Sequence, residues 1–523
     1  MLNETARRGI RAPSPVLLSA DSGFLWWHWV SVVIIIAISF YFGFTGFLAS
    51  DDFSYSQGAV HWLRHFPYLG QNHWELRHTI VLPLAASFSL FGISEPSLIL
   101  VSMAYVAGLI AVTGYFVRRR VSARAAYLTM LVLGLTPLFA TGASTVFSDI
   151  PEVFFIALSL FLYEEGMETQ DENRNKLFLF SAGLACGLAY LTRETTFILI
   201  FYYIILFFVG RLKDFSSYLL VAVGFLAVFA VDTAFLALHS GDILYRLHTT
   251  IAGIDSDNPA IRHVSATGRG LFDPVGGVNA PWPIAPIAMM FASHYFGLLF
   301  LLALPLGIWL MIAKQASETT LRLTHLFGGF GLTWFLWLAY GLPALFVTPR
   351  YQSATAYCAA IVLGLGCAEL FIQRRRVALS ILILFGVTAL AATSLDNKDL
   401  LFGERTLVRF AATSEEPIYT DYATARSARF LLDERNLADR VLTRAPPAGA
   451  LYFYNSSPAR PYYNRDWKSI VPNDSWIPLE TIAPPKHWGA YLVEWLGLTK
   501  WLPDQILQKL TNSGKEVVIY HVQ

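Results

Sequence analysis

The sequence predicts an all-α, polytopic membrane bundle followed by a small mixed α/β domain. Of its 523 residues, 55% are hydrophobic and only 14% are charged, whereas soluble proteins carry about 25% charged residues. The apolar residues also gather in long blocks, for example at 30–40, 128–140 and 197–209. A helix needs about 20 apolar residues to cross a bilayer, and block after block meets this length. We therefore expect an integral membrane protein.

About eleven stretches meet the length criterion for a membrane-spanning helix. They are 26–48, 96–117, 123–142, 150–163, 177–191, 195–210, 216–238, 287–312, 325–346, 351–371 and 376–394. The first is longer than the apolar core of a signal peptide, which has about 7–15 residues, so we expect an uncleaved first helix. Cytoplasmic loops are rich in Lys and Arg, and alternate loops carry them, including 118–120 and 374–376. This pattern predicts a cytoplasmic N-terminus and an extracytoplasmic C-terminus.

The spans divide the chain into three predicted parts. These are a cytoplasmic tail at 1–25, a transmembrane domain at 26–394 and an extracytoplasmic domain at 395–523. The transmembrane domain has two long outer loops. The first, at 49–95, is expected to hold interfacial helices at 53–66 and 78–91, and the second, at 240–286, little regular structure.

The chain becomes polar after Leu395. Segments at 417–420 and 450–454 have the apolar and aromatic character of short strands, and a final strand is expected at 516–522. A helix is expected at 424–435. These elements predict a small domain that combines strands and helices.

Charged residues within or beside membrane spans are costly and therefore informative. Several are predicted to gather at one depth, on the outer side. They are Asp51 and Asp52 after the first span, Arg77 before the short helix, Asp149 and Glu152 at the start of the fourth span, Arg193 and Glu194 between the fifth and sixth, and Arg350 before the tenth. Taken singly, each has an ordinary explanation as a helix cap or a side chain that reaches the interface. Together they indicate a polar cavity that opens outward.

The residue types in this cavity suit glycosyl transfer from a polyprenyl phosphate. Arginine presents a planar, permanently charged fork that matches phosphate oxygens. A carboxylate beside it can accept the proton of an attacking hydroxyl. The net charge of +1 argues against a nucleic-acid partner.

Three other functions compete with this interpretation. A transporter or flippase of a lipid-linked or anionic substrate would carry charges through the depth of the membrane, where Asp232 is the main example here. A polysaccharide polymerase or ligase would rely on a large outer loop late in the chain. A receptor or scaffold would need no acids and arginines at one depth.

Five short elements, in a fixed order, resemble the GT-C class of polytopic glycosyltransferases. They are DDFSY at 51–55, RHTIVLP at 77–83, FSDIP at 147–151, GLACGLAYLTRE at 183–194 and the pair Arg350-Tyr351. The branch they resemble contains protein O-mannosyltransferases, the lipid A aminoarabinose transferase and lipopolysaccharide galacturonosyltransferases. The chain departs from it in two places, because Asp52 replaces the usual Glu and the paired prolines are missing near Arg77.

This resemblance implies a role for each residue of the predicted cavity. Asp51 would be the general base of an inverting displacement, with Asp52 next in line. Asp149 would position the base, the acceptor or a metal. The donor phosphate would be held by Arg77, Arg193 and Arg350, with supporting roles for Tyr55, Glu152, Glu194 and Tyr351.

The resemblance also implies the partners. The donor would be a polyprenyl-phosphate hexose or pentose, and the acceptor lipid A or lipopolysaccharide, a glycan or a protein. The protein would lie among the lipids of a bacterial inner membrane, to which the uninterrupted spans and short loops also point.

His61 and His65 are the candidate metal ligands. They lie four residues apart in the predicted interfacial helix, so they can share a face and bind a metal with a nearby acid. Some GT-C members use a divalent metal ion, which makes this a possible cofactor. The alternative is an aromatic belt at the interface, formed with Trp62, Phe66 and Tyr68.

Overall fold

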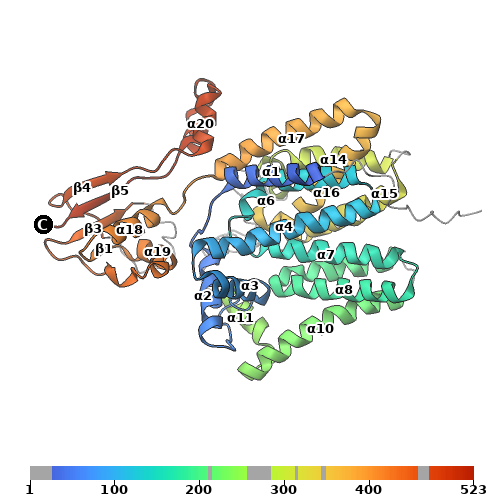
Figure 1. Ribbon diagram of the computed structural model, residues 1–523, viewed down its shortest axis with the longest axis horizontal. Coiled ribbons are helices and arrows are strands. Elements are labelled where there is room, and N and C mark those ends of the chain that lie inside the picture. Colours follow the sequence, from blue (N-terminus) through green and yellow to red (C-terminus); the bar gives the residue numbers. More distant parts are fainter. Residues whose placement is uncertain (1–25, 210–214, 256–283, 313–315, 343–348, 457–469) are drawn as a thin grey trace, which may run out of the picture.

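The computed structural model shows a helical bundle joined at one end to a small sheet domain (Figure 1). It describes residues 26–209, 215–255, 284–312, 316–342, 349–456 and 470–523. The predicted tail at 1–25 and most of the loop predicted at 240–286 lie outside these residues.

Each of the predicted spans contains at least one helix. The helices of the bundle are α1 (Trp26–Gly43), α4 (Glu95–Arg120), α5 (Ala123–Leu135), α6 (Pro137–Gly142), α7 (Asp149–Glu168), α8 (Glu172–Thr192), α9 (Phe197–Phe208), α10 (Phe215–Ser240), α13 (Ala285–Ala292), α14 (Leu299–Ile312), α15 (Glu318–Leu336), α16 (Ser353–Gln373) and α17 (Arg375–Asp396). Two predicted spans are broken. The first breaks at Pro137, where proline begins a new helix because it has no backbone N–H, and the second between α13 and α14.

Four described helices are long and apolar enough to cross a membrane on their own. They are Glu95–Arg120, Phe215–Ser240, Pro349–Gln373 and Arg375–Leu395. Shorter apolar helices accompany them, among them Ala123–Leu135 and Leu299–Ile312. The molecule is thus mostly helical and membrane-like, and the number of spans stays a prediction.

Small residues let the helices approach closely. At the crossing of α8 and α10, a Cβ on Gly183 would meet the backbone of Val221 and Gly224. In the same way, a Cβ on Gly364 of α16 would meet Thr129 of α5. The small residues therefore set how closely these helices approach one another.

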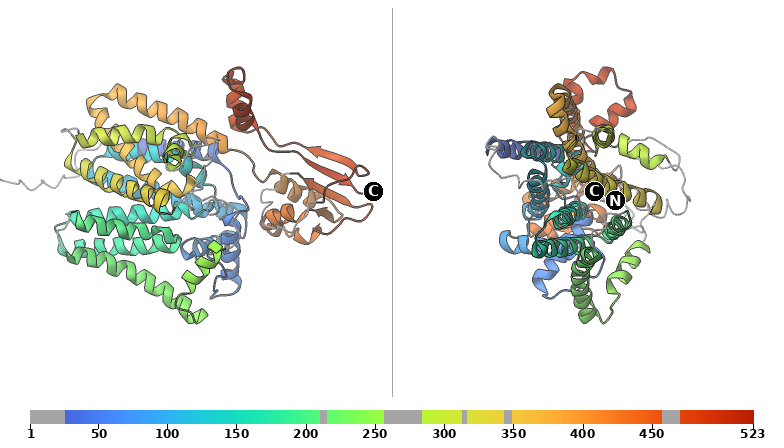
Figure 2. Two further views of the ribbon diagram at one scale, coloured as in Figure 1. Left: turned by 180° about the vertical axis from the view of Figure 1, so that it is seen from behind. Right: turned by 90° about the vertical axis from the view of Figure 1, so that its right-hand side faces the viewer.

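Two short helices lie across one end of the bundle (Figures 1 and 2). They are α2 (Asp51–Arg64) and α3 (His78–Phe91), within a residue or two of the predicted interfacial helices. We call this the Asp51 end. The expectation of little regular structure in the second long loop is wrong for its described beginning, because α11 (Tyr245–Asp255) is a helix that also lies at this end.

A five-stranded sheet forms the core of the C-terminal domain. Its strands are β1 (Ile418–Thr420), β2 (Val441–Leu442), β3 (Leu451–Asn455), β4 (Ile477–Ile482) and β5 (Val517–His521), in the order β2-β1-β3-β5-β4. Strand β1 pairs in parallel with β2 and β3, whereas β5 is antiparallel to β3 and β4. The predicted strands and the helix α19 (Tyr422–Glu434) are present, and α18 (Phe402–Thr413) adds a helix that the sequence analysis did not include.

A salt bridge and aromatic packing connect the C-terminal domain to the Asp51 end. Arg405 of α18 forms a salt bridge with Glu95 at the start of α4, with Nη2 2.6 Å from Oε1. The same Glu95 oxygen accepts the backbone N–H of Phe47 at 2.9 Å. The ring of Phe430 from α19 packs 4.9 Å from that of Phe47. The domain therefore borders the segment that leads into Asp51.

Candidate active site

Acids and arginines from four parts of the chain meet at the Asp51 end. Arg350 Nη2 lies 2.9 Å from Oδ2 of Asp51, and its Nη1 lies 3.9 Å from Oδ2 of Asp149. The side chains of Asp51 and Arg350 are 16% and 25% exposed, so the pair lies near the surface. The structure thus brings the first loop and the start of α16 to one point, although they are almost 300 residues apart in the sequence.

Arg193 binds two acids of α7. Its Nη1 lies 2.6 Å from Oδ1 of Asp149 and 3.4 Å from Oε2 of Glu152. The Glu152 carboxylate also accepts a hydrogen bond of 2.7 Å from the Thr196 hydroxyl. The guanidinium carbon of Arg193 lies 4.0 Å from the ring centre of Tyr351, which gives a cation–π contact. Arg193 therefore neutralises buried carboxylates and is held in place by them.

Arg77 precedes α3 and points between α2 and α7. Its Nη1 donates to the Tyr55 hydroxyl and, over 3.2 Å, to Ser148. Burial raises the pKa of Tyr55 to about 12, so this hydroxyl stays protonated. Among the described residues, Nε of Arg77 has no hydrogen-bond partner although the side chain is buried. An unsatisfied buried donor costs about 1–3 kcal/mol, which a bound anion would recover.

Further unsatisfied polar atoms surround the same site. Asp149 Oδ2, His73 Nδ1 and Gln352 Nε2 are buried without a hydrogen-bond partner in the part of the chain that the structure describes. Buried polar groups in native proteins are almost always paired. A polar ligand bound beside Arg77 and Arg350 would give these atoms partners.

Asp51 and Asp52 have different environments. Asp52 is fully buried and accepts three backbone N–H groups, from Leu48 at 2.5 Å, Ser50 at 2.6 Å and Phe53 at 3.0 Å. These hydrogen bonds fix the backbone turn that leads into α2. The Asp51 carboxylate instead faces Arg350. The Asp52 carboxylate is therefore held by backbone donors, whereas the Asp51 carboxylate is paired with an arginine side chain.

The charges around Asp51 keep it ionised. Burial alone would raise its pKa, but the nearby Arg350, Arg77 and Arg193 outweigh burial and hold the pKa below its usual value of 3.8. For His73, burial and the positive charge of Arg77 disfavour the charged form and lower the pKa to about 4. At neutral pH the site thus combines a carboxylate, a neutral imidazole and permanent cations.

A second ion cluster lies beside the first and includes a residue that the sequence analysis did not select. Arg246 of α11 contacts Asp232 of α10 through Nε at 2.9 Å and Glu194 through Nη1 at 3.4 Å. It also donates to the Leu76 carbonyl over 2.7 Å. His78 Nδ1 lies 3.0 Å from the other Asp232 oxygen. Through Arg246, the two acids therefore hold α11 beside Leu76, the residue that precedes Arg77.

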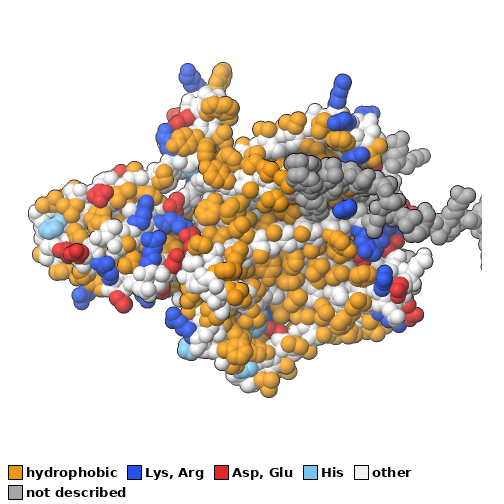
Figure 3. Space-filling view, in the orientation of Figure 1, with side chains coloured by type: hydrophobic (Ala, Val, Ile, Leu, Met, Phe, Trp, Pro, Cys, Tyr) orange, Lys and Arg blue, Asp and Glu red, His pale blue; other side chains and the backbone are white. Residues whose placement is uncertain are grey.

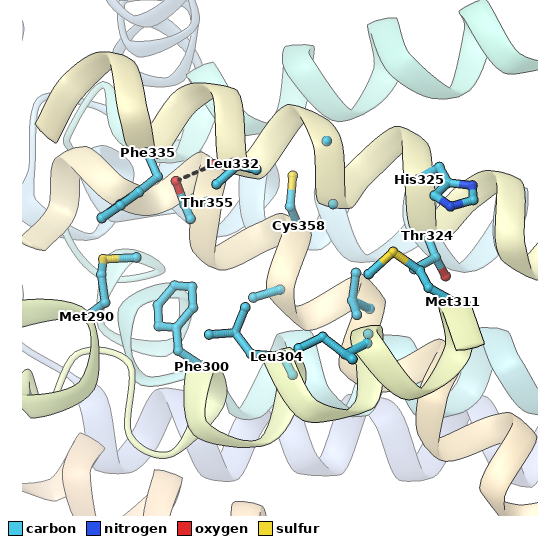
Figure 4. A pocket seen from close by; sticks show the side chains of 18 of the residues that line it. Met290, Phe300, Leu304, Met311, Thr324, His325, Leu332, Phe335, Thr355 and Cys358 are labelled. Atoms are coloured by element: carbon cyan, nitrogen blue, oxygen red, sulfur yellow. Dashed lines mark hydrogen bonds between the residues drawn. The ribbon is translucent and has the colours of Figure 1, made fainter. Parts of the chain in front are cut away.

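An apolar cavity of about 550 Å³ opens between α13, α14, α15 and α16 (Figure 4). Its walls include Met290, Phe300, Leu332 and Phe335. Thr355, also in the wall, donates a hydrogen bond of 2.7 Å to Gln352. Gln352 in turn lies two residues after Arg350. The cavity thus begins within one helical turn of the charged site and extends into the bundle.

The two candidate metal ligands, His61 and His65, have different surroundings. His61 Nδ1 lies 3.0 Å from the Tyr68 hydroxyl, which donates to Glu75. His65 is exposed. In the described residues no group of three or more His, Cys, Asp or Glu side chains is placed to hold a metal ion. His61 and His65 are therefore not part of such a group among the described residues.

Comparison with known proteins bears on the fold. Residues 79–234 match the family described as dolichyl-phosphate-mannose-protein mannosyltransferase. The structure of ArnT from Cupriavidus metallidurans in the apo state is similar, with a TM-score of 0.50 and 14% identity over 82% of this chain and 92% of that one. The chain has the GT-C fold. The predicted resemblance to this class is confirmed.

Two further GT-C structures are similar to this chain. One is ArnT from the same organism bound to undecaprenyl phosphate, with a TM-score of 0.51 and 13% identity over 83% of this chain and 93% of that chain. The other is the Archaeoglobus fulgidus oligosaccharyltransferase tethered to an acceptor peptide, with a TM-score of 0.50 and 15% identity over 81% of this chain and 60% of that chain. The comparison with curated protein sequences found no match. At these identities the likeness concerns the fold.

The candidate site contains residues that no sequence motif identified. Gln352 had a positional signal, because it directly follows Arg350-Tyr351. His73 and Arg246 had none, since each lies in a loop that is already rich in polar residues. Their importance depends on contacts with distant parts of the chain.

Proposed function

We propose that this protein transfers a glycosyl group from a polyprenyl-phosphate donor to an acceptor at the Asp51 end of the bundle. The observation that carries the proposal is the pairing of Asp51, kept ionised, with Arg350 beside the unsatisfied donor of Arg77. A carboxylate and arginines at one point are what such a transfer needs. The family match and the GT-C fold support the same reaction class.

The site provides separate surfaces for the two parts of the donor. Arg350 and Arg77 would bind the phosphate, because the Arg350 side chain is 25% exposed and the buried Nε of Arg77 has no hydrogen-bond partner among the described residues. The apolar cavity that begins at Thr355 would take the first units of the polyprenyl chain. A similar structure, ArnT, contains undecaprenyl phosphate. The acceptor is lipid A or lipopolysaccharide, a glycan or a protein, and the sugar is a hexose or pentose.

In the reaction, an acceptor hydroxyl attacks the anomeric carbon of the donor. The new glycosidic C–O bond forms as the bond between this carbon and the phosphate oxygen breaks. The hydroxyl proton passes to the Asp51 carboxylate, and polyprenyl phosphate leaves with the bonding electrons. General base catalysis contributes about 10²–10⁴ in rate, and cations at the leaving oxygen contribute a comparable electrostatic factor.

Arg193 has a different task in this proposal from the one that the resemblance implied. Its Nη1 is engaged by Asp149 and Glu152. We therefore assign it to positioning Asp149 beside Arg350, with phosphate binding left to Arg350 and Arg77. Tyr351 supports Arg193 through its ring.

The distribution of basic residues supports the orientation that we propose. The end opposite the Asp51 end carries Arg118–Arg120 as the last residues of α4 and Arg374–Arg376 where α16 gives way to α17. The positive-inside rule assigns this end to the cytoplasm. The reaction would then take place at the extracytoplasmic face of a bacterial inner membrane.

The test uses purified protein and a panel of polyprenyl-phosphate sugars with extracted envelope lipids, and measures free polyprenyl phosphate by mass spectrometry. Wild type should release it, and Asp51→Asn should bind the donor without turnover. Asp433→Asn, an exposed acid in the C-terminal domain, serves as the matched control and should keep activity. If no donor binds and Asp51→Asn equals wild type in every assay, the proposal is wrong. Transport in sealed vesicles would then be measured.

A further inference from the structure

An aromatic projection extends from the edge of the C-terminal sheet. Strands β4 and β5 are antiparallel neighbours, and such a pair can be joined by a two-residue turn. Here residues 483–516 connect them and form α20 (Trp488–Trp495), η7 (Leu498–Lys500) and α21 (Asp504–Thr511). We call residues 483–516 the β4–β5 projection. It leaves the sheet and runs back to the bundle (Figure 1).

The projection exposes large apolar side chains. Trp495 and Trp501 are 81% and 83% exposed, and Leu496 and Tyr491 are 56% and 50% exposed. A soluble surface rarely shows a contiguous apolar patch without a partner. We therefore expect Trp495 and Trp501, which are both almost fully exposed, to lie in an apolar environment.

The position of the projection identifies this surrounding. The ring of Trp488 lies 5.3 Å from that of Phe42 and 6.0 Å from that of Tyr41, at the end of α1. Helix α20 also packs against α17, and it reaches sideways beyond the bundle at the level where α1 and α17 end (Figures 1 and 2). The projection thus lies where a bilayer around the bundle would have its surface.

The apolar surface continues from the projection onto the bundle. Helix α17 exposes Ile383 and Val387, which are 64% and 63% exposed, as a lipid-facing helix does. In Figure 3 the hydrophobic side chains of the projection lie mostly on the side toward the bundle, and charged side chains lie on its other side. A bilayer that covers α17 would therefore also meet the apolar side of the projection.

We propose that the β4–β5 projection binds the lipid bilayer, with Trp495 and Trp501 at the boundary between headgroups and acyl chains. Tryptophan and tyrosine prefer this depth because their rings are apolar and carry one polar group. The C-terminal domain is then held twice, by Arg405–Glu95 at the bundle and by lipid at its far edge. This inference does not depend on the proposed reaction.

The test uses the full-length protein in lipid nanodiscs. The three native cysteines, Cys186, Cys358 and Cys367, are buried, so Leu496→Cys can carry a fluorescent label. Glu480→Cys on exposed β4 is the control at a site away from the projection. Nitroxide attached to lipid headgroups should quench the label at 496 several-fold more than the label at 480, and a water-soluble quencher should act in the opposite order.

A second comparison asks whether the tryptophans cause this contact. In the Leu496→Cys background, Trp495→Ser together with Trp501→Ser should reduce quenching by lipid nitroxide toward the value at 480. Equal access of the soluble quencher to both labels would overturn the proposal. Protection at 496 that appears only when two copies share a nanodisc would overturn it in favour of a contact between copies.

Discussion

Arg350 joins the two acids of the site, because its Nη2 lies 2.9 Å from Asp51 and its Nη1 lies 3.9 Å from Asp149. The side chain proposed to bind the donor phosphate is therefore paired with the proposed base. A phosphate that binds Arg350 competes with the Asp51 carboxylate for the same N–H groups. Donor binding would then release Asp51 and raise its pKa, so the base becomes stronger when the substrate is in place.

The first prediction separates the two neighbouring acids. Asp52→Asn removes a charged acceptor that binds three backbone N–H groups, and a hydrogen bond to a charged group is worth about 1.5–3 kcal/mol. This variant should lower the thermal unfolding temperature in detergent. Asp51→Asn should lose turnover with a smaller change in unfolding temperature. Equal stability losses with full activity in both would contradict the assignment.

The second prediction concerns pH. The pKa of Asp51 is held below 3.8 in the folded protein, so the stabilisation from its ion pair is present above pH 3.8 and is lost as the pH falls through the lowered value. The difference in unfolding temperature between wild type and Asp51→Asn should therefore be constant from about pH 5 to 8. A difference that changes within this range would show that Asp51 titrates there. Fluorescence-detected melting curves provide the measurement.

The third prediction tests the apolar cavity. Gly328 lines it, and a Cβ built there meets nothing within 4 Å, so Gly328→Phe should place a ring into the cavity and reduce its volume. We expect a KM for long-chain polyprenyl donors about tenfold higher, equivalent to roughly 1.4 kcal/mol, with little change for a donor with a short chain. Ile383→Phe on the exposed face of α17 is the matched control. An equal effect on both donors would argue against the cavity as the chain site.

The fourth prediction concerns the pair of Asp232 and Arg246, which are 5% and 8% exposed. Removing one partner of a buried ion pair costs about 3–5 kcal/mol, whereas replacing both by apolar residues is often neutral. Arg246→Met should therefore destabilise the protein strongly, and Asp232→Leu combined with Arg246→Met should recover much of the loss. Unfolding in a double-mutant cycle measures this coupling. Additive losses would show that the two side chains act independently.

Much of the architecture could be predicted from the sequence. Apolar blocks placed the helices of the bundle, and α3 begins and ends at the predicted residues because polar segments bound its apolar run. The structure brings several of the predicted acids and arginines into contact, and their roles stay a prediction. These residues could be selected from the sequence because charged residues beside membrane spans are rare.

The pairing within the group could not be predicted. Arg350 meets Asp51, and Arg193 meets Asp149, but any arginine at that depth suits any of the acids. The structural task of Asp52 depends on the path of residues 48–53. Arg246 lies at the start of α11, whose position depends on contacts with Asp232 and Glu194. Such contacts join residues far apart in the sequence and leave no local pattern.

The contact of Phe430 with Phe47 changes how the C-terminal domain should be regarded. Phe47 precedes Asp51 by four residues, and Phe430 also packs against Phe88 of α3. The domain therefore packs against both the segment that leads into Asp51 and the helix that follows Arg77. A chain cut after α17 would keep its apolar helices but expose Phe47 and Phe88 to water.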